Sequence, residues 1–310
     1  MQHYKTVLGD VAAADLGVTL PHEHICCYSE YLYQMAGKQY LDKDLLLLYA
    51  VEYLKELKKT YHLHTFVDCT PVNIGRDLDL LKRASEQSGV NILCSTGFYY
   101  TEEPLVCRLA PERIADFLIT DALSSQASIL KCAVEQEQIS SGLEKILTAI
   151  GQAQRSLGLP IVLHTNAKNK NALPALEILL SCGVKPQAIT VGHLSDTDDV
   201  EYLKTVAAYG CYLGFDRLYG DTSEEYINKT TQKILALTQS GFGDKLLLSH
   251  DALFFNGFEP DPQIRKTPRY AYVFDHILPK LPTELAEKIT RENPANMLGC
   301  GEQHENSHHF

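Results

Sequence analysis

Residues 161–180 read IVLHTNAKNKNALPALEILL, and this stretch contains one unit of the pattern that decides the fold. The run Ile161–His164 is short, apolar and β-branched, which is typical of a buried strand. The segment Ala172–Leu180 that follows it has the periodicity of a helix. We therefore interpret the stretch as a strand followed by a helix.

The same unit recurs on both sides of this stretch. Further strands are predicted at Gly17–Leu20, Thr65–Asp68, Ile92–Thr96, Ser128–Lys131, Ala188–Gly192, Cys211–Gly214 and Lys245–Ser249. Further helices are predicted at Lys43–Lys59, Asp77–Ser88, Ile114–Leu123, Leu143–Leu157, Val200–Ala208, Glu224–Gln239 and Tyr270–Leu281.

Strands that alternate with helices predict an α/β fold, a parallel sheet with crossover connections. The chain has 310 residues, and this length favours a closed (β/α)8 TIM barrel over an open doubly wound sheet. The nucleotide-binding motifs G-x-G-x-x-G and P-loop are missing from the sequence. We expect residues 1–298 to form one barrel domain and residues 299–310, with three histidines, to be a disordered tail.

The composition excludes some functions. Formal net charge is −11, which argues against a nucleic-acid partner. The sequence has no apolar stretch of about 18 residues, so no membrane span is expected, and no signal peptide is recognised at its start. The nine cysteines are scattered, without C-x2-C spacing. We interpret them as reduced thiols of a cytoplasmic protein.

Side chains that bind metals follow the apolar runs where the predicted strands end. They are His22, His24, Lys131, His164, His193 and Asp251. The carboxyl ends of barrel strands converge on one mouth, where barrel enzymes have their active sites. Imidazole and carboxylate ligands suit zinc, manganese, iron or cobalt. The pattern therefore predicts a metal site at the mouth of the barrel.

Each of these residues also has a simpler interpretation. The pair His22 and His24 could be ordinary polar surface, and His164 and His193 could be hydrogen-bonded core histidines. Asp251 could cap the following loop. Lys131 could form a Schiff base as an unmodified amine, or it could be carbamylated and bridge two metals. The metal interpretation depends on their joint occurrence on equivalent strand ends.

The chain resembles the phosphotriesterase family of the amidohydrolase superfamily over nearly its whole length. The matching segments are Leu16-Gly-Val-Thr-Leu-Pro-His-Glu-His24, Asn73-Ile-Gly-Arg-Asp77, Thr96-Gly-Phe-Tyr99, Lys131, His164-Thr-Asn166, Gly192-His-Leu-Ser-Asp-Thr-Asp198, Gly214-Phe-Asp-Arg217, Ser249-His-Asp251 and Glu292-Asn-Pro294.

This resemblance implies a site with two divalent metals, most often zinc. His22, His24 and Asp251 would hold the buried metal, and His164 and His193 the more exposed one. Carboxylated Lys131 would bridge them. A hydroxide shared by the metals would attack a lactone or carboxylic ester, and Asp251 would accept its proton. Family members are commonly dimers, so a homodimer is expected.

Two further residues bear on the substrate. Tyr99 and Arg217 resemble positions of the phosphotriesterase-like lactonases, in which the tyrosine orients the lactone. True phosphotriesterases have a histidine in place of Arg217, acting with an aspartate that corresponds to Asp196. Aromatic packing for Tyr99 and a salt bridge for Arg217 are the simpler interpretations.

Other functions stay open at this point. The loop Ser249–Thr267 is a candidate lid, and its apolar part could receive an acyl chain or form a dimer contact. The basic residues Arg265, Lys266 and Arg269, in this loop and just after it, could bind the phosphate of a sugar lactone, or simply be solvated. The remaining alternatives are an aryl esterase or phosphotriesterase, and a barrel that binds a ligand without converting it.

Overall fold

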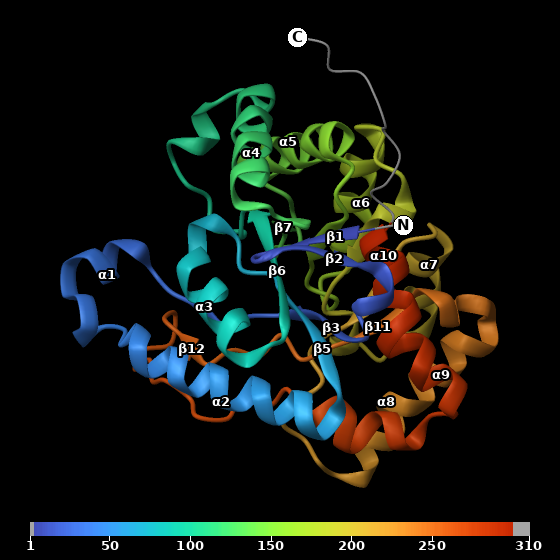
Figure 1. Cartoon of the computed structure of the whole chain (residues 1–310). Helices are drawn as coiled ribbons and strands as arrows, with labels where there is room; N and C mark the ends of the chain where they lie inside the picture. The colour runs from blue at the N-terminus through green and yellow to red at the C-terminus, as the bar shows by residue number, and fades with distance from the viewer. Residues whose placement is uncertain (1–2, 300–310) are drawn as a thin grey trace.

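The fold is a single (β/α)8 barrel, as predicted, and the computed structural model describes residues 3–299 of it (Figure 1). Eight parallel strands stand in the order β11-β10-β9-β8-β7-β6-β5-β3. They are β3 (Val18–Glu23), β5 (Leu63–Asp68), β6 (Asn91–Gly97), β7 (Ile129–Ala133), β8 (Ile161–His164), β9 (Ile189–Val191), β10 (Tyr212–Phe215) and β11 (Leu246–Leu248).

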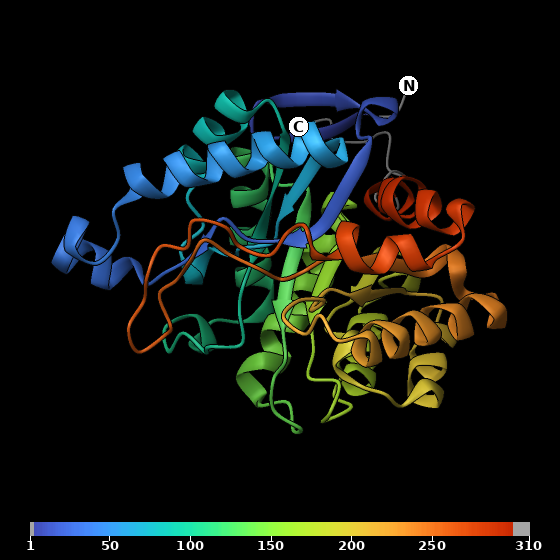
Figure 2. The same cartoon turned by 90° about the horizontal axis from the view of Figure 1, so that it is seen from below.

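Helices follow the strands and cover the outside of the barrel (Figure 2). They are α2 (Lys43–Tyr61), α3 (Leu78–Ser88), α4 (Pro111–Ser125), α5 (Ser141–Leu157), α6 (Ala172–Ser181), α7 (Val200–Ala208) and α8 (Glu224–Leu237). Several begin where the sequence supplies a capping side chain. Asp42, Asp77 and Ser140, for example, each accept a hydrogen bond from the backbone N–H three residues on.

Side chains along the strands point alternately out of the barrel and into it, which gives an outer and an inner apolar layer. Leu130 and Leu163 face outward and pack against the helices. Ile129 and Val162 belong to the inner cluster. Because successive strand residues point to opposite sides, Lys131 and His164 point inward with Ile129 and Val162. The inner apolar layer therefore lies beneath the polar residues at the strand ends.

The barrel closes between β3 and the chain that follows β11. Asp251 N donates to His22 O at 3.2 Å, and His24 N donates to Ala252 O at 3.1 Å. The buried Glu23 carboxylate accepts hydrogen bonds from Ser249 Oγ, from the His250 backbone and ring, and from Ala252 N. Beyond the closure, β4 (Cys26–Cys27) pairs in parallel with β12 (Phe255–Asn256). These bonds attach the loop after β11 to the mouth.

Some elements were not predicted. The hairpin β1 (His3–Thr6) and β2 (Gly9–Ala12) lies across the far end of the barrel with α10 (Asn293–Gly299), as Figure 1 shows. The short helices α1 (Glu30–Ala36) and α9 (Thr283–Glu287) were also missed.

The predicted helix Tyr270–Leu281 was wrong in type. The chain forms a π-helical turn at Val273–Ile277 and a 3-10 turn at Leu278–Lys280. Pro279 lies in this segment and has no N–H for a regular helical hydrogen bond. The predicted tail 299–310 lies, apart from Gly299, outside the described residues.

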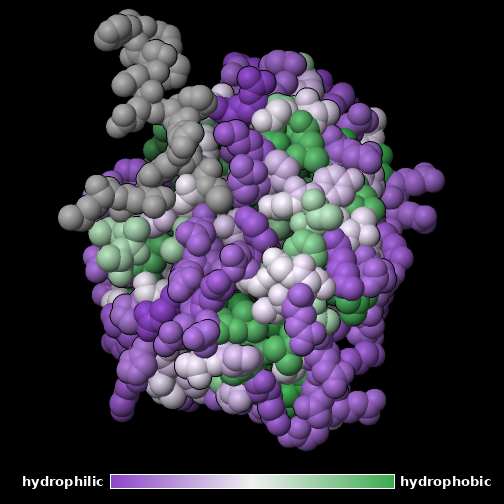
Figure 3. Space-filling model, turned by 90° about the vertical axis from the view of Figure 1, so that its right-hand side faces the viewer, coloured by the Kyte–Doolittle hydropathy of each residue, from purple (hydrophilic) through white to green (hydrophobic). Residues whose placement is uncertain are grey.

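The face of the molecule in Figure 3 is mostly hydrophilic, with apolar side chains in scattered groups. Within residues 3–299, no helix combines the length and the hydropathy that a membrane span requires. The cysteines of this range are free thiols, and most of them are buried.

Candidate metal centre

The six side chains predicted as metal ligands lie together at the barrel mouth, linked by a chain of contacts. His22 Nε2 lies 2.8 Å from Lys131 Nζ and 3.6 Å from Asp251 Oδ1. His24 Nε2 lies 3.0 Å from the same Asp251 oxygen. His193 Nε2 lies 2.7 Å from His164 Nδ1, and the His22 and His193 rings are 5.3 Å apart. His22, Lys131 and His164 lie in β3, β7 and β8, and His24, His193 and Asp251 follow β3, β9 and β11.

Asp216, just after β10, holds two of these histidines. Its Oδ2 accepts from His22 Nδ1 at 2.5 Å, and its Oδ1 accepts from His193 Nδ1 at 2.9 Å and from the His193 backbone N–H. A carboxylate on one ring nitrogen fixes the tautomer and leaves the other nitrogen with its lone pair free. Both Nε2 atoms are therefore presented to the centre of the mouth.

The contact between His164 and His193 lacks a proton. His164 Nε2 donates to Glu135 Oε2 at 2.9 Å, and His193 Nδ1 donates to Asp216. In neutral imidazoles, the facing nitrogens 2.7 Å apart would then both carry lone pairs. Burial and the neighbouring His193 hold the pKa of His164 well below its usual value. A proton on His193 Nε2, or a cation bound by both nitrogens, would remove this repulsion.

Lys131 is a buried amine, 2% exposed. Among residues 3–299, no carboxylate lies within ion-pair distance of its Nζ, and His22 is its hydrogen-bond partner. A buried ammonium without a counter-ion is costly. Conversion of Lys131 to a carbamate would remove the positive charge and add oxygen ligands.

Asp251 is the acidic member of the cluster. Burial opposes its charged form, but His193, His24 and His22 together hold its pKa well below the usual range. Its second oxygen, Oδ2, accepts from Arg217 Nε at 3.0 Å. Arg217 Nη1 also pairs with Asp196 Oδ2 at 3.0 Å. Arg217 thus makes the salt bridges of its simpler interpretation, and one of them orients Asp251.

His22 has the protonation state that a metal ligand requires. Burial and the nearby Lys131 lower the pKa of His22 to about 4, so this imidazole is neutral at neutral pH. Neutral imidazole and ionised carboxylate are the forms that bind divalent metals. Ligand atoms of His22, His193 and Asp251 lie within 4.8 Å of one another and form a possible metal site.

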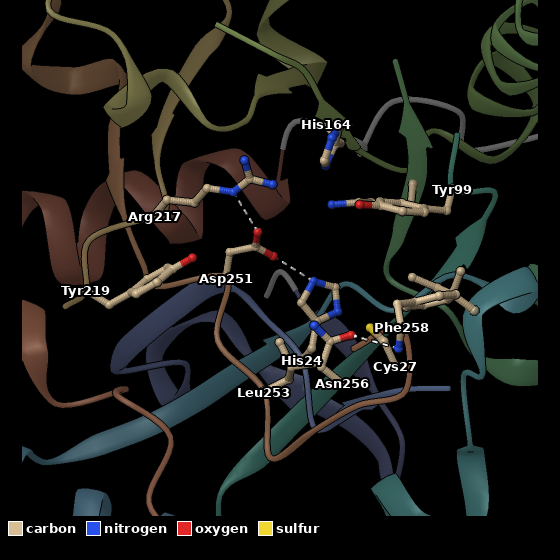
Figure 4. Close-up of a pocket in the computed structure, with 12 residues that line it drawn as sticks. His24, Cys27, Tyr99, His164, Arg217, Tyr219, Asp251, Leu253, Asn256 and Phe258 are labelled. Atoms are coloured by element: carbon tan, nitrogen blue, oxygen red, sulfur yellow. Dashed lines mark hydrogen bonds and ion pairs between the residues drawn. The ribbon is translucent and has the colours of Figure 1, made fainter. Parts of the chain in front are cut away.

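A cavity of about 230 Å³ opens above the cluster, and Figure 4 shows its lining. Tyr99 stands on one side, with its ring edge-on to His164 at 5.2 Å. Tyr99 N donates to Asn73 Oδ1 at 2.8 Å, which fixes the backbone there. From the loop after β11, Leu253 and Phe258 line the cavity, whereas Phe254 and Phe255 are buried in the core.

Sequence reasoning missed the residues that hold these ligands. Glu135 and Asp216 bind the outer nitrogens of the histidines, and Thr70 Oγ1 lies 2.8 Å from His24 Nδ1. The inward direction of Asp216 could have been predicted from the two-residue period of a strand. Tyr212 lies in the inner cluster, and Asp216 is four residues further along, so both side chains point to the same side. Glu135 and Thr70 lie in loops, where no periodicity indicates direction.

In this barrel, imidazoles and a carboxylate converge at the mouth. This arrangement is typical of barrel enzymes. The model of the phosphotriesterase family matches residues 2–298, and this chain therefore belongs to the phosphotriesterase family.

Three relatives illustrate the range of the family. The "aryldialkylphosphatase" of Saccharolobus solfataricus is 30% identical over 92% of this chain and 95% of its own. The "phosphotriesterase homology protein" of Mycobacterium tuberculosis is 30% identical over 91% of each chain. The human "N-acetyltaurine hydrolase" is 26% identical over 95% of this chain and 97% of its own. These names place the chain among hydrolases.

Proposed function

We propose that this chain is a binuclear metal-dependent hydrolase that opens a lactone or cleaves a carboxylic ester. The observation that carries the proposal is the contact between His164 Nδ1 and His193 Nε2, which face each other at 2.7 Å while their other nitrogens donate to Glu135 and Asp216. In neutral rings, two such lone pairs are a ligand pair that a cation at the mouth would bind, which supports the proposal.

The donor set fits two divalent cations. His22, His24 and Asp251 would hold the buried cation, His164 and His193 the more exposed one, and carboxylated Lys131 would bridge them. Imidazole and carboxylate suit zinc first, with manganese, iron and cobalt as alternatives. When bound, the cations would lower the pKa of a water molecule and polarise the substrate carbonyl.

The protein's own groups would move the proton and place the substrate. Asp251, ionised and held by Arg217 Nε, would take the proton of the attacking water and deliver it to the alkoxide oxygen as the C–O bond breaks. Water would thus add to the carbonyl carbon, and the product would be a hydroxy acid. Tyr99 would orient the lactone from the side of the cavity beside His164.

Arg217 favours a lactone or ester over a phosphotriester. Its guanidinium is committed to Asp251 and Asp196, and it cannot give up a proton near neutral pH. A relay that carries a proton outward through this position is therefore blocked. The aryl esterase and phosphotriesterase activities are arms of the test below, and the phosphorylated sugar lactonase activity stays an alternative. The name of the human relative adds the cleavage of an acyl amide to the test.

The test combines metal analysis with a substrate panel. We expect about two equivalents of metal per chain after gentle purification, and turnover of γ- and δ-lactones above that of aryl esters, N-acetyltaurine and a paraoxon-like triester. Asp251→Ala should lose about 10²–10⁴-fold in kcat with the fold retained. The matched control Asp244→Ala should keep activity, because Asp244 is exposed and pairs with Lys288 at the other end of β11.

A chain without metal and without turnover of the panel would be the ligand-binding barrel instead. Faster cleavage of the triester than of any lactone or aryl ester would reject the substrate assignment but keep the metal centre.

We also propose that the protein is a cytoplasmic homodimer. The free thiols favour a reducing compartment. Helix α1 projects from the barrel (Figure 1) and exposes Tyr31, Leu32 and Met35, an apolar group that a second copy would cover. Light scattering on the wild type and on Tyr31→Ser with Met35→Ser tests this assembly.

A further inference from the structure

The histidines of the proposed buried cation are oriented by groups that are themselves buried. His22 Nδ1 donates to Asp216 Oδ2 at 2.5 Å, and His24 Nδ1 lies 2.8 Å from Thr70 Oγ1. Asp216 is 1% exposed and Thr70 is 2% exposed. The Thr70 hydroxyl donates to Cys26 O at 3.3 Å, which leaves its oxygen to accept from His24. Solvent therefore does not reach the groups that orient this pair.

His164, a ligand of the proposed exposed cation, has a partner of another kind. Its Nε2 atom lies 2.9 Å from Glu135 Oε2 and donates to it, because an ionised carboxylate only accepts. The His164 side chain is 3% exposed, whereas the Glu135 side chain is 30% exposed. Within residues 3–299, Glu135 forms no hydrogen bond or ion pair with another candidate ligand. Figure 4 shows His164 and His24 on different sides of the cavity.

The segment after β8 fixes Glu135 in this place. Asn166 Nδ2 donates to the second carboxylate oxygen, Glu135 Oε1, at 2.8 Å. Asn169 Nδ2 donates to Glu135 O at 3.0 Å, and Asn171 Nδ2 donates to the backbone carbonyl oxygens of both neighbours of Glu135. Both carboxylate oxygens are thus engaged, and the backbone that carries them is held by the same segment that follows His164.

We infer that Glu135 is the positioning residue of the more exposed cation, so that it sets the affinity of that site and not the affinity of the buried one. A carboxylate on the outer nitrogen fixes the tautomer of an imidazole and makes the other nitrogen a stronger ligand. In His164 that other nitrogen is Nδ1, which faces His193 Nε2 at 2.7 Å. The inference rests on the proposed binuclear function, and it makes the occupancy of the second site adjustable on its own.

The test titrates metal-free protein with cobalt(II) in the presence of bicarbonate, followed by calorimetry and by visible absorption. Cobalt suits imidazole and carboxylate ligands, and its absorption reports their geometry. We expect the wild type to bind two equivalents. Glu135→Ala should weaken one of the two binding steps about 10–100-fold, as for other groups that orient a ligand, and should leave the other step within about twofold.

Two further variants sharpen the result. Glu135→Gln keeps the length and one acceptor oxygen but loses the charge, so its affinity should lie between those of the wild type and Glu135→Ala. Glu137→Ala is the matched control. Glu137 is an exposed glutamate two residues further along the same loop, and within the described part of the chain it forms no ion pair. Its removal should change neither binding step. Circular dichroism checks that each variant is folded.

Nitrogen-15 NMR of histidine-labelled protein reads the positioning itself, without any metal. The His164 signals can be assigned by their loss in His164→Asn. In the metal-free wild type, we expect His164 to be the tautomer with the proton on Nε2. In Glu135→Ala its two nitrogen shifts should move towards those of a tautomer mixture. Glu137→Ala should give the wild-type shifts.

Two unchanged binding steps in Glu135→Ala overturn the inference and leave the binuclear hydrolase proposal intact. Equal weakening of both steps also overturns it, because Glu135 would then stabilise the mouth as a whole. A His164 tautomer that is the same in Glu135→Ala and in the wild type rejects the orienting role. A wild type that binds fewer than two equivalents refutes the binuclear proposal itself, and the inference falls with it.

Discussion

The Asp216 carboxylate determines how two of the candidate ligands are presented. It is 1% exposed and accepts from His22 Nδ1, His193 Nδ1 and the His193 backbone. Burial disfavours its charge, but His193 and His22 hold its pKa well below the ordinary range. His193 has a left-handed backbone, with φ of 63°, which is uncommon for a residue with a side chain. The hydrogen bonds that His193 donates to Asp216 compensate for that conformation.

Asp216→Asn tests this positioning role. The amide replaces one acceptor oxygen by an NH2 donor. This donor would face the N–H of one histidine ring, and the tautomer of that ring would no longer be fixed. We expect metal affinity or kcat to fall about 10–100-fold, as for other residues that orient ligands, and excess metal should restore part of the activity. Asp244→Asn, on the exposed side of the molecule, should behave like the wild type. Unchanged metal content and kcat in Asp216→Asn would contradict the role.

The meeting of the candidate ligands at the mouth was predictable, because five of them lie near or just after the end of an apolar strand run. Lys131 lies inside the run of β7. His164 and Lys131 follow Val162 and Ile129 by two residues, so the period of a strand gives them the same side. The partners Glu135 and Thr70 were not predictable, because they lie beyond strand ends, where hydrogen bonds set the direction of a side chain.

At the scale of elements, Arg76 connects the loop after β5 to two neighbours. Its Nη1 donates to Ser95 O at 2.9 Å on β6, and both Nη atoms bind the Asp121 carboxylate of α4 at 2.7 and 2.8 Å. The same loop contains Asn73, which binds the Tyr99 backbone. This loop therefore connects α4 to the part of the cavity wall that contains Tyr99.

Asp121→Asn should destabilise the protein in a way that depends on pH. Burial raises the pKa of Asp121, but Arg76 outweighs it and the net pKa is lowered. A lowered pKa means that the stabilisation is fully present above the unfolded value, about 3.9, and is lost as the pH falls through the folded value. We expect a loss of about 2 kcal/mol at pH 7, shrinking below about pH 4.

Denaturant unfolding of both proteins at several pH values measures this difference. Asp79→Asn serves as the control, because the exposed pair of Asp79 with Arg83 is 3.6 Å long and should contribute less than about 0.5 kcal/mol. A difference between wild type and Asp121→Asn that stays constant down to pH 3 would show that packing, and not charge, is responsible.

The regular elements were predicted best where strand and helix follow each other closely. β8 (Ile161–His164) and α7 (Val200–Ala208) have their predicted bounds. The pair β4 and β12 was missed because each has two residues and its partner is distant in sequence. No local pattern indicates such a pairing. The hairpin β1–β2 was missed because it caps the barrel and lies outside the repeat.

For the whole molecule, the proposed metal centre and the barrel core would be separate sources of stability. The inner cluster around Val162 and Leu247, and the outer clusters under the helices, contain none of the candidate ligands. The barrel should therefore remain folded without metal. Ligands that bind only the native state nevertheless add to its stability, by about 3–4 kcal/mol at 100 to 1,000 times Kd.

Chelation and reconstitution test both the metals and Lys131. Removal of metal should abolish turnover and lower Tm by at least about 4 °C, with the far-ultraviolet circular dichroism unchanged. Zinc should restore both properties, and faster when bicarbonate is present, because the proposed carbamate on Lys131 would have to form from carbon dioxide before the site could hold the cations. Lys131→Met keeps an apolar side chain of similar length at this buried position, and its recovery should not respond to bicarbonate. If the wild type recovers at the same rate in buffer freed of carbon dioxide, Lys131 acts as the unmodified amine; trapping of a carbonyl substrate with borohydride would then distinguish a Schiff base from a purely structural lysine.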